Sequence, residues 1–203
     1  MTLAFQLIVL LFSVVIHEVA HGAVADRLGD PTARYAGRLT LNPIKHLDLF
    51  GSVILPIGLF FISGGGFLFG WAKPVPFNPH NLKRPERDGA LIAIAGPLSN
   101  LSLAFIFGLA VKASVPFSSS PIIENLQPFF SIIVLTNVAL AVFNLVPLPP
   151  LDGSKVIFAF LPRSADKIKF FLEQYGPFFL LTFIFFGFNI ISPIIYIIYK
   201  FLI

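Results

Sequence analysis

The sequence has 203 residues, of which 56% are hydrophobic and only 12% are charged, and its mean hydropathy is +0.87. Such a chain has too little polar surface to cover a water-soluble globule, so it is expected to be an integral membrane protein. The net charge of +4 does not indicate nucleic-acid binding, because the basic residues are spread among loops between apolar runs. The sequence contains no cysteine, which leaves nitrogen and oxygen ligands for any metal site.

The first apolar run, residues 3–25, has the length of a membrane-spanning helix and carries HEVAH at residues 17–21. His17 and His21 are four residues apart, so on a helix both imidazoles lie on one face and can bind the same metal ion. Glu18 projects beside them and can accept a proton from water, as in the HExxH zinc site. Ionisable residues are costly within a spanning helix, so their presence favours a functional role over a chance match.

The residues that follow predict a short strand and a segment that enters the membrane without crossing it. Residues 36–41 alternate apolar and polar side chains as a strand does, although an ordinary loop hairpin fits the same pattern. Residues 50–70 are apolar, but Pro56 and a glycine run interrupt them. If this segment re-enters, all Lys and Arg residues except Lys112 and Lys200 lie on one side, as the positive-inside rule requires.

Three later apolar runs predict the remaining spanning helices. Residues 89–113 form the second, and the connector 114–128 has no Lys or Arg, as expected of an external loop. Residues 129–145 cross back, and residues 176–199 provide a fourth crossing.

A carboxylate follows the third spanning helix. Three of residues 147–150 are prolines, which cannot continue a helix, so Asp152 is expected on unwound chain near the membrane face. Asp152 could be the third metal ligand or the N-cap of a short helix that follows it. His46 and His80 compete for the ligand position, but both lie in polar loops, and surface positions at the membrane interface suit them better.

Two asparagines lie in otherwise apolar helices. Asn100 is expected to hydrogen-bond between helices, where it would help them to pack. Asn144, at the end of the third spanning helix, could hold a substrate backbone or a developing oxyanion, and a bond to another helix fits it equally well.

The motifs together resemble one family. HEVAH at residues 17–21 and NLVPLPPLDG at residues 144–153 are similar to the paired motifs of the site-2 proteases, the intramembrane zinc metalloproteases of peptidase family M50. GWAKPVP at residues 70–76 and AGPLSN at residues 95–100 extend the resemblance. It implies that His17, His21 and Asp152 bind one Zn²⁺ per chain, that Glu18 is the catalytic acid and base, and that Asn144 binds substrate. It also implies a membrane-associated β element near residues 37–41.

The sequence therefore predicts an all-α polytopic membrane protein with about four transmembrane helices, a re-entrant segment and a small membrane-associated β element. We expect one intramembrane metalloprotease domain over residues 1–203, with core motifs at 10–160, a C-terminal helix at 174–200 and no PDZ or CBS domain. Its expected activity is zinc-dependent hydrolysis of peptide bonds within or near transmembrane segments of membrane proteins.

The expected partners are a membrane-spanning substrate and the lipid bilayer, with no nucleic acid, and the oligomeric state is not predicted. The chain is expected to be a multi-pass protein of the cell membrane with its active site toward the cytoplasm. Two other functions fit some of the same residues. A divalent-metal transporter could line a pathway with His17, Glu18, His21 and Asp152, and a non-catalytic membrane scaffold could bind zinc structurally.

Overall fold

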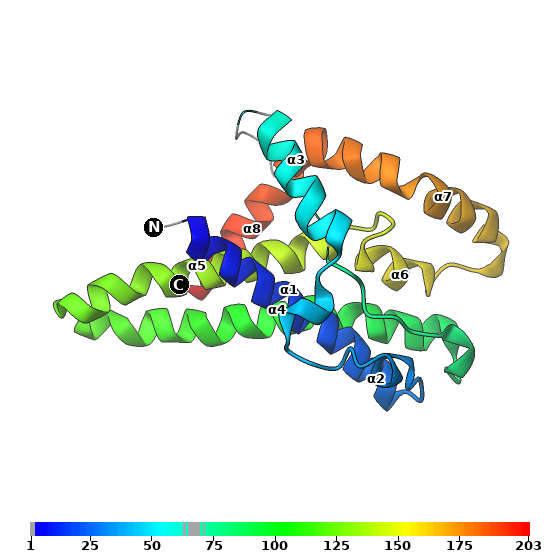
Figure 1. Cartoon of the computed structure of the whole chain (residues 1–203), viewed down its shortest axis with the longest axis horizontal. Coiled ribbons are helices and arrows are strands. Elements are labelled where there is room, and N and C mark those ends of the chain that lie inside the picture. The colour runs from blue at the N-terminus through cyan, green and yellow to red at the C-terminus, as the bar shows by residue number, and fades with distance from the viewer. Residues whose placement is uncertain (1–2, 63, 65–69, 71) are drawn as a thin grey trace.

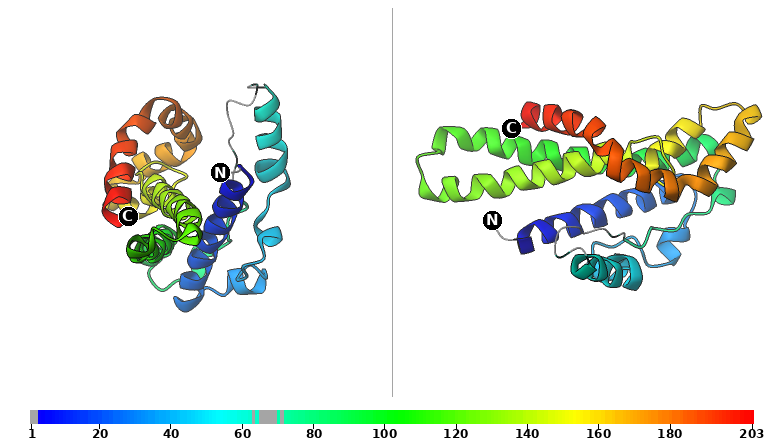
Figure 2. Two further views of the ribbon diagram at one scale, coloured as in Figure 1. Left: turned by 90° about the vertical axis from the view of Figure 1, so that its left-hand side faces the viewer. Right: turned by 90° about the horizontal axis from the view of Figure 1, so that it is seen from above.

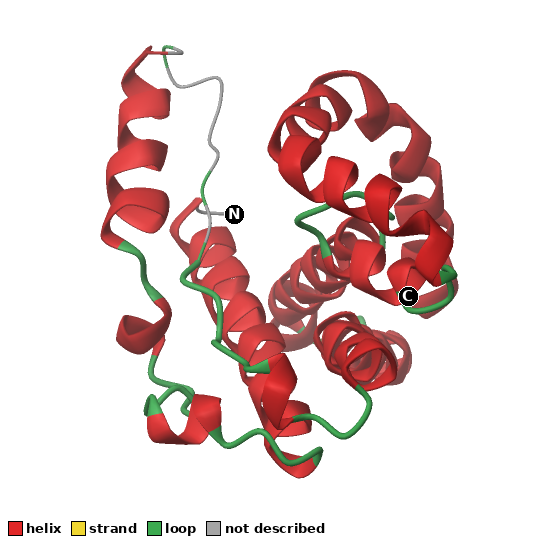
Figure 3. Cartoon of the chain, turned by 90° about the vertical axis from the view of Figure 1, so that its right-hand side faces the viewer, coloured by secondary structure: helices red, strands yellow, loops and turns green. Residues whose placement is uncertain are grey.

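The computed structural model describes residues 3–62, 64, 70 and 72–203, and this part of the chain is helical with no strand (Figure 3). The α-helices are α1 (Leu3–Arg27), α2 (Thr32–Tyr35), α3 (Leu55–Ile62), α4 (Pro85–Ser114), α5 (Pro121–Asn144), α6 (Asp152–Phe158), α7 (Asp166–Thr182) and α8 (Phe188–Leu202). Short 3-10 helices are η1 (Pro43–His46), η3 (Pro79–Asn81), η4 (Val115–Phe117) and η5 (Arg163–Ala165), and π-helical turns are η2 (Leu49–Ile54) and η6 (Phe183–Gly187).

Four helical stretches of the described chain are long and apolar enough to cross a membrane, which confirms the predicted number. They are Leu3–Arg27, Pro85–Phe117, Pro121–Asn144 and Asp166–Leu202. At most 33% of the residues in any of these spans are buried inside the protein. Large apolar side chains such as Phe105, Ile106 and Phe186 lie more than half exposed on the outer faces. Apolar surface of this extent is unusual on a soluble monomer and suits contact with lipid.

Three spanning helices begin earlier than the sequence predicted, among them α4, which begins at Pro85 rather than at residue 89. α5 begins at Pro121, because a proline at the first helical position has a backbone angle already suited to the helix and lacks only an N–H that would be unpaired there. Pro128, predicted to lie in the connector, is inside the helix. The last stretch begins at Asp166, and its 37 residues include the polar first turns of α7 and the π-helical turn η6.

The helices α1, α4 and α5 form the centre of the molecule, with α3 on one side and α7 and α8 on the opposite side (Figure 2). α4 and α5 lie side by side as a long antiparallel hairpin, and α4 also packs against α1 and α6 (Figure 1). The start of α1, the end of α8 and the turn between α4 and α5 lie toward one end of the molecule, while α2 and α6 lie toward the other. Packing on α4 therefore brings α1 and α6, which are far apart in sequence, to the same place.

The strand expected over residues 36–41 is not formed. The backbone N–H groups of Ala36, Gly37 and Arg38 donate to carbonyls of residues 32–34 and close the end of α2, so they cannot join a strand ladder. Gly37 has φ +63°, the left-handed conformation that commonly ends a helix. The alternating pattern of residues 36–41 therefore reflects a helix end and a turn.

The predicted re-entrant segment, residues 50–70, lies partly outside the described residues. Its first half forms η2 and then α3, which has eight residues. A helix of that length spans about 12 Å, which is less than half the thickness of the bilayer core. The segment between α3 and the connecting segment 72–78 includes residues that the structure does not describe, so the re-entrant path stays a prediction.

Buried polar side chains hold the connecting segment 72–78 against the turn that follows α1. The guanidinium of Arg38 donates to the carbonyl oxygen of Lys73 at 2.6 Å and to that of Pro74 at 3.3 Å. The N–H of Lys73 donates to the carbonyl of His46 at 2.9 Å, and the N–H of Asn78 donates to the carboxylate of Asp30 at 2.6 Å. These bonds fix the position of a segment that has no regular secondary structure.

We expect replacement of Asp30 by Asn to lower stability in a pH-dependent way. Burial acts to raise the pKa of Asp30, but hydrogen bonds from Thr32, Asn81 and the Asn78 N–H outweigh it, so the pKa lies below the ordinary 3.8. The stability that this ionised carboxylate contributes is fully present above pH 3.8 and is lost as the pH falls through the lower native value. The variant should lose about 1–3 kcal/mol of unfolding free energy at pH 7.

The measurement is thermal unfolding of both proteins in detergent from pH 7 to pH 3. The difference in melting temperature between the two proteins should become smaller toward pH 3. Asp166→Asn is the matched control, because its carboxylate is 64% exposed. If the difference in melting temperature stays constant with pH, the charge of Asp30 is not what stabilises this turn.

Candidate metal centre

Two imidazoles meet one turn apart on α1. The Nε2 atoms of His17 and His21 lie 3.0 Å apart, as the four-residue spacing on a helix predicts. His17 is 6% exposed, so the pair lies inside the protein. At an axial rise of about 1.5 Å per residue, His17 is about 15 Å from the end of α1 at Arg27, which is within the thickness of a membrane.

Asp152 is the first residue of α6 and points at both imidazoles. One of its carboxylate oxygens, Oδ2, lies 3.0 Å from Nε2 of His17 and 3.2 Å from Nε2 of His21. The N-cap of α6 is Leu151, so Asp152 does not have the capping role that the sequence left open. Burial acts to raise the pKa of Asp152, but hydrogen bonding to the two histidines holds the pKa well below its usual range. The carboxylate is therefore ionised at neutral pH.

Two glycines allow the loop before Asp152 to fold tightly. A Cβ atom on Gly153 would lie 2.2 Å from the carbonyl oxygen of Leu145, so the start of α6 is pressed against the end of α5. A Cβ atom on Gly176 of α7 would lie 2.6 Å from the carbonyl oxygen of Pro149. Both distances are far below van der Waals contact, so a side chain at either position would move the loop that carries Asp152.

Hydrogen bonds on the far side of each ring determine which nitrogen faces Asp152. Nδ1 of His17 lies 2.6 Å from Oδ1 of Asn100, and Nδ1 of His21 lies 2.7 Å from the carbonyl oxygen of Ile92. Both partners are acceptors, so each Nδ1 carries a proton, and a ring protonated only at Nδ1 directs the lone pair of Nε2 inward. Two nitrogen lone pairs and a carboxylate oxygen then face one another, and a proton or a cation must lie among them.

The three inward atoms have the spacing of a metal site. Zinc bond lengths in a tetrahedral site place neighbouring ligand atoms about 3.3 Å apart, and the three separations here are 3.0, 3.0 and 3.2 Å. Space for the cluster depends on Gly96 of α4, because a Cβ atom there would lie 2.5 Å from Nε2 of both histidines. Within the described residues, His17, His21 and Asp152 form the group that could hold a metal ion.

Glu18 is held by a different part of the chain. Its carboxylate accepts a hydrogen bond of 2.8 Å from the N–H of Val75, in the connecting segment 72–78. Gly22 allows this approach, since a Cβ atom there would lie 2.8 Å from the Val75 side chain and 2.7 Å from that of Leu39. The carboxylate of Glu18 is therefore oriented by the connecting segment and not by a neighbouring helix.

The other predicted candidates do not join this cluster. Asn144 donates to the carbonyl of Leu140 on its own helix at 2.9 Å. His80 is exposed, as expected. The predicted surface position of His46 is wrong, because this side chain is 1% exposed and its Nε2 bonds to the carbonyl of Thr40 at 2.8 Å. The polar turn folds over the ring, which the polarity of the local sequence did not indicate.

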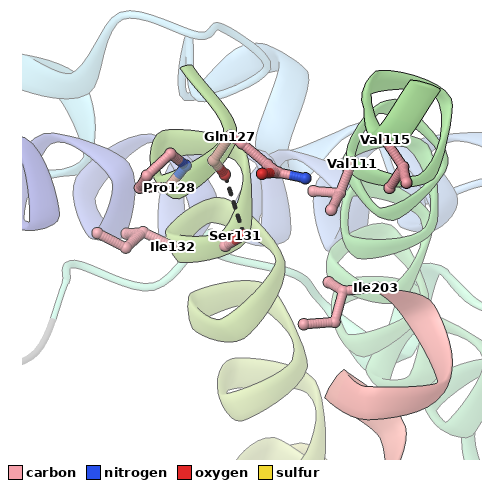
Figure 4. A pocket seen from close by; sticks show the side chains of 7 residues that line it. All are labelled: Val111, Val115, Gln127, Pro128, Ser131, Ile132 and Ile203. Atoms are coloured by element: carbon pink, nitrogen blue, oxygen red, sulfur yellow. Dashed lines mark hydrogen bonds between the residues drawn. The ribbon is translucent and has the colours of Figure 1, made fainter. Parts of the chain in front are cut away.

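A pocket of about 610 Å³ lies elsewhere in the protein, between the end of α4, the first half of α5 and the C-terminus (Figure 4). It is lined by Val111, Val115, Gln127, Pro128, Ser131, Ile132 and Ile203, of which none is charged. Ser131 donates to the backbone carbonyl of Gln127 at 3.0 Å. Val111 is about 22 Å along α4 from Gly96, so this pocket is separate from the clustered histidines.

Comparison with known proteins identifies the family. The family model described as peptidase family M50 matches residues 5–120 and 111–186. The chain belongs to peptidase family M50. The resemblance to the site-2 proteases seen in the sequence is thus confirmed.

Individual relatives agree with this assignment. Among those named "putative zinc metalloprotease" are YwhC of Bacillus subtilis (strain 168) and Rip2 of Mycobacterium tuberculosis (strain H37Rv). YwhC is 42% identical over 85% of this chain and 76% of its own length, and Rip2 is 30% identical over 85% of this chain and 63% of its own length. Zinc metalloprotease MJ0392 of Methanocaldococcus jannaschii is 26% identical over 82% of this chain and 37% of its own length. No solved structure matches significantly.

Proposed function

We propose that this chain is a zinc-dependent endopeptidase that hydrolyses peptide bonds within or near the membrane-spanning segments of other proteins. The observation that carries the proposal is the convergence of Nε2 of His17, Nε2 of His21 and a carboxylate oxygen of Asp152 within 3.2 Å of one another, with Glu18 next to His17 in the sequence. The membership of family M50 and the zinc metalloprotease names of its relatives support the same reaction.

In this proposal His17, His21 and Asp152 would hold one zinc ion. When bound, the ion lowers the pKa of a water molecule and polarises the scissile carbonyl group. Glu18 takes a proton from the attacking water and later delivers it to the leaving amine, a role that suits a carboxylate oriented by the Val75 N–H. Asn144 is proposed to hold the substrate backbone or the developing oxyanion after its bond to Leu140 is exchanged.

The proposed site of action is the lipid bilayer, with the active site on the cytoplasmic side. The apolar faces of the four spans support action in the lipid bilayer of the cell, and the bias of basic residues supports a cytoplasmic active site. The segment 50–70 is proposed to re-enter rather than cross, which keeps its flanking basic residues on that side. A helical substrate hides its carbonyls in internal hydrogen bonds, so it must unwind locally before it can be cleaved.

The test is cleavage of a model single-span substrate by the purified chain in detergent. We expect cleavage that a zinc chelator abolishes and added Zn²⁺ restores. Liposomes that contain the same protein should not accumulate divalent metal in their interior. Metal accumulation without cleavage would replace the proposal by a transporter, and bound zinc with neither activity would replace it by a structural scaffold.

A further inference from the structure

A layer of buried polar side chains crosses the bundle behind His17. Besides His17 it contains Ser13 of α1, Asn100 of α4 and Asn137 of α5, which are 4%, 0% and 0% exposed. Polar groups buried between spanning helices are costly unless they are paired, and each of these side chains is paired with another member of the layer. Asn137 is two helical turns before Asn144 and was not singled out by the sequence motifs.

The hydrogen bonds in this layer are donated away from the metal centre, from His17 to Asn100 of α4 and from Asn100 to Asn137 of α5. The Nδ2 group of Asn137 donates to Oγ of Ser13 at 3.0 Å and to the carbonyl of Ile133 at 2.9 Å, which leaves its Oδ1 facing α4. Oδ1 of Asn137 accepts from Nδ2 of Asn100 at 2.9 Å, and this same Nδ2 donates to the carbonyl of Ser13 at 3.2 Å. Oδ1 of Asn100 is then turned toward Nδ1 of His17 at 2.6 Å.

The orientation of the Asn100 amide decides the state of His17. A reversed amide would present an N–H group to Nδ1 of His17 and would favour the ring form with its proton on Nε2. That proton would occupy the nitrogen that faces His21 and Asp152 and would oppose metal binding. His21 has no such ambiguity, since its partner is the backbone carbonyl of Ile92.

We propose that Asn137 is a positioning residue that acts through Asn100 to keep the proton of His17 on Nδ1 and its Nε2 free for metal. This inference rests on the metal centre of the proposed function. It gives α5 a role in that centre although α5 supplies none of its three clustered side chains.

The main test measures the affinity of the purified, zinc-free chain for Zn²⁺ by competition with a chelator. Asn137→Ala should weaken zinc binding by about 10- to 100-fold, the range typical of residues that orient metal ligands. Val134→Ala is the matched control, because it also truncates a fully buried side chain of α5 but lies in the apolar core. It should lower the melting temperature by a similar amount and leave the zinc affinity unchanged.

A rescue separates positioning from general packing. In Asn100→Asp both side-chain oxygens accept hydrogen bonds, so His17 keeps its proton on Nδ1 whichever way the group faces. Adding Asn137→Ala to Asn100→Asp should therefore cost less than threefold in zinc affinity, although the same change in the wild type costs at least tenfold. Nitrogen-15 chemical shifts of the His17 ring should show the proton on Nδ1 in the wild type and in the double variant.

Specific results would overturn the inference. They are an unchanged zinc affinity in Asn137→Ala, an equal loss in Val134→Ala, or an unchanged protonation pattern of His17 in Asn137→Ala. Failure of the proposed function looks different: the wild type would bind zinc with the predicted dependence on Asn137 but would cleave no substrate.

Discussion

Glu18→Gln should reduce peptide hydrolysis by about 10²- to 10⁴-fold, the usual contribution of a general acid and base, and leave zinc binding intact. The amide of glutamine keeps an oxygen that can accept from the N–H of Val75, so the local structure should be preserved. The glutamine amide, unlike the carboxylate, cannot accept a proton from water at neutral pH. The measurements are the rate of substrate cleavage and the zinc content of the same preparation.

Glu124→Gln is a suitable control, because Glu124 lies in the first turn of α5, at the opposite end of the molecule from α6. It should cleave at the wild-type rate. If Glu18→Gln lost zinc in proportion to activity, Glu18 would be part of the metal centre. If it kept at least a tenth of the activity, another group would be the base.

Gly96→Ala should weaken metal binding and reduce hydrolysis together. The added methyl group would lie 2.5 Å from Nε2 of both His17 and His21, and contacts this short force the rings to move. Because both rings are held from behind by Asn100 and Ile92, they cannot retreat without losing those bonds. We expect zinc affinity to fall by at least about 10- to 100-fold, as for other changes beside metal ligands.

Gly89→Ala provides the comparison on the same helix. Nothing lies within 4 Å of a Cβ atom at Gly89, so this change should leave zinc affinity unaltered and stabilise the helix slightly. Zinc titration and melting temperature would be measured for both variants. Wild-type zinc affinity in Gly96→Ala would mean that α4 does not limit the space around the imidazoles.

The sequence predicted the parts of this protein that depend on nearby residues or on hydropathy. The four spans follow from apolar runs, because a bilayer demands long apolar helices. The facing imidazoles of His17 and His21 follow from helical spacing alone. The meeting of Asp152 with these residues, over 130 positions away, was one of two roles that the local sequence left open for it, and only the family resemblance chose between them.

The missed features depend on contacts between distant segments. His46 is buried because the chain folds over it. The predicted hydrogen bonding of Asn100 between helices is confirmed, but its contact with His17, which depends on the packing of α1 against α4, was not predicted. The only local signal for Asn100 and Asn137 was an amide inside an apolar helix, which also fits ordinary helix packing. The prediction of a strand at residues 36–41 was wrong, because the N–H groups of residues 36–38 bond to carbonyls of α2 and cannot join a strand ladder.

The hydrogen bond between Val75 and Glu18 implies that inactive forms of this protein fall into two groups. The side chains of the metal centre come from α1 and α6 and are braced by α4, whereas Glu18 is braced by the connecting segment 72–78. Substitutions that disturb α4 should yield inactive protein without zinc. Substitutions that disturb the connecting segment 72–78 should yield inactive protein that still binds zinc. The zinc content of an inactive variant therefore tells which of these two supports has failed.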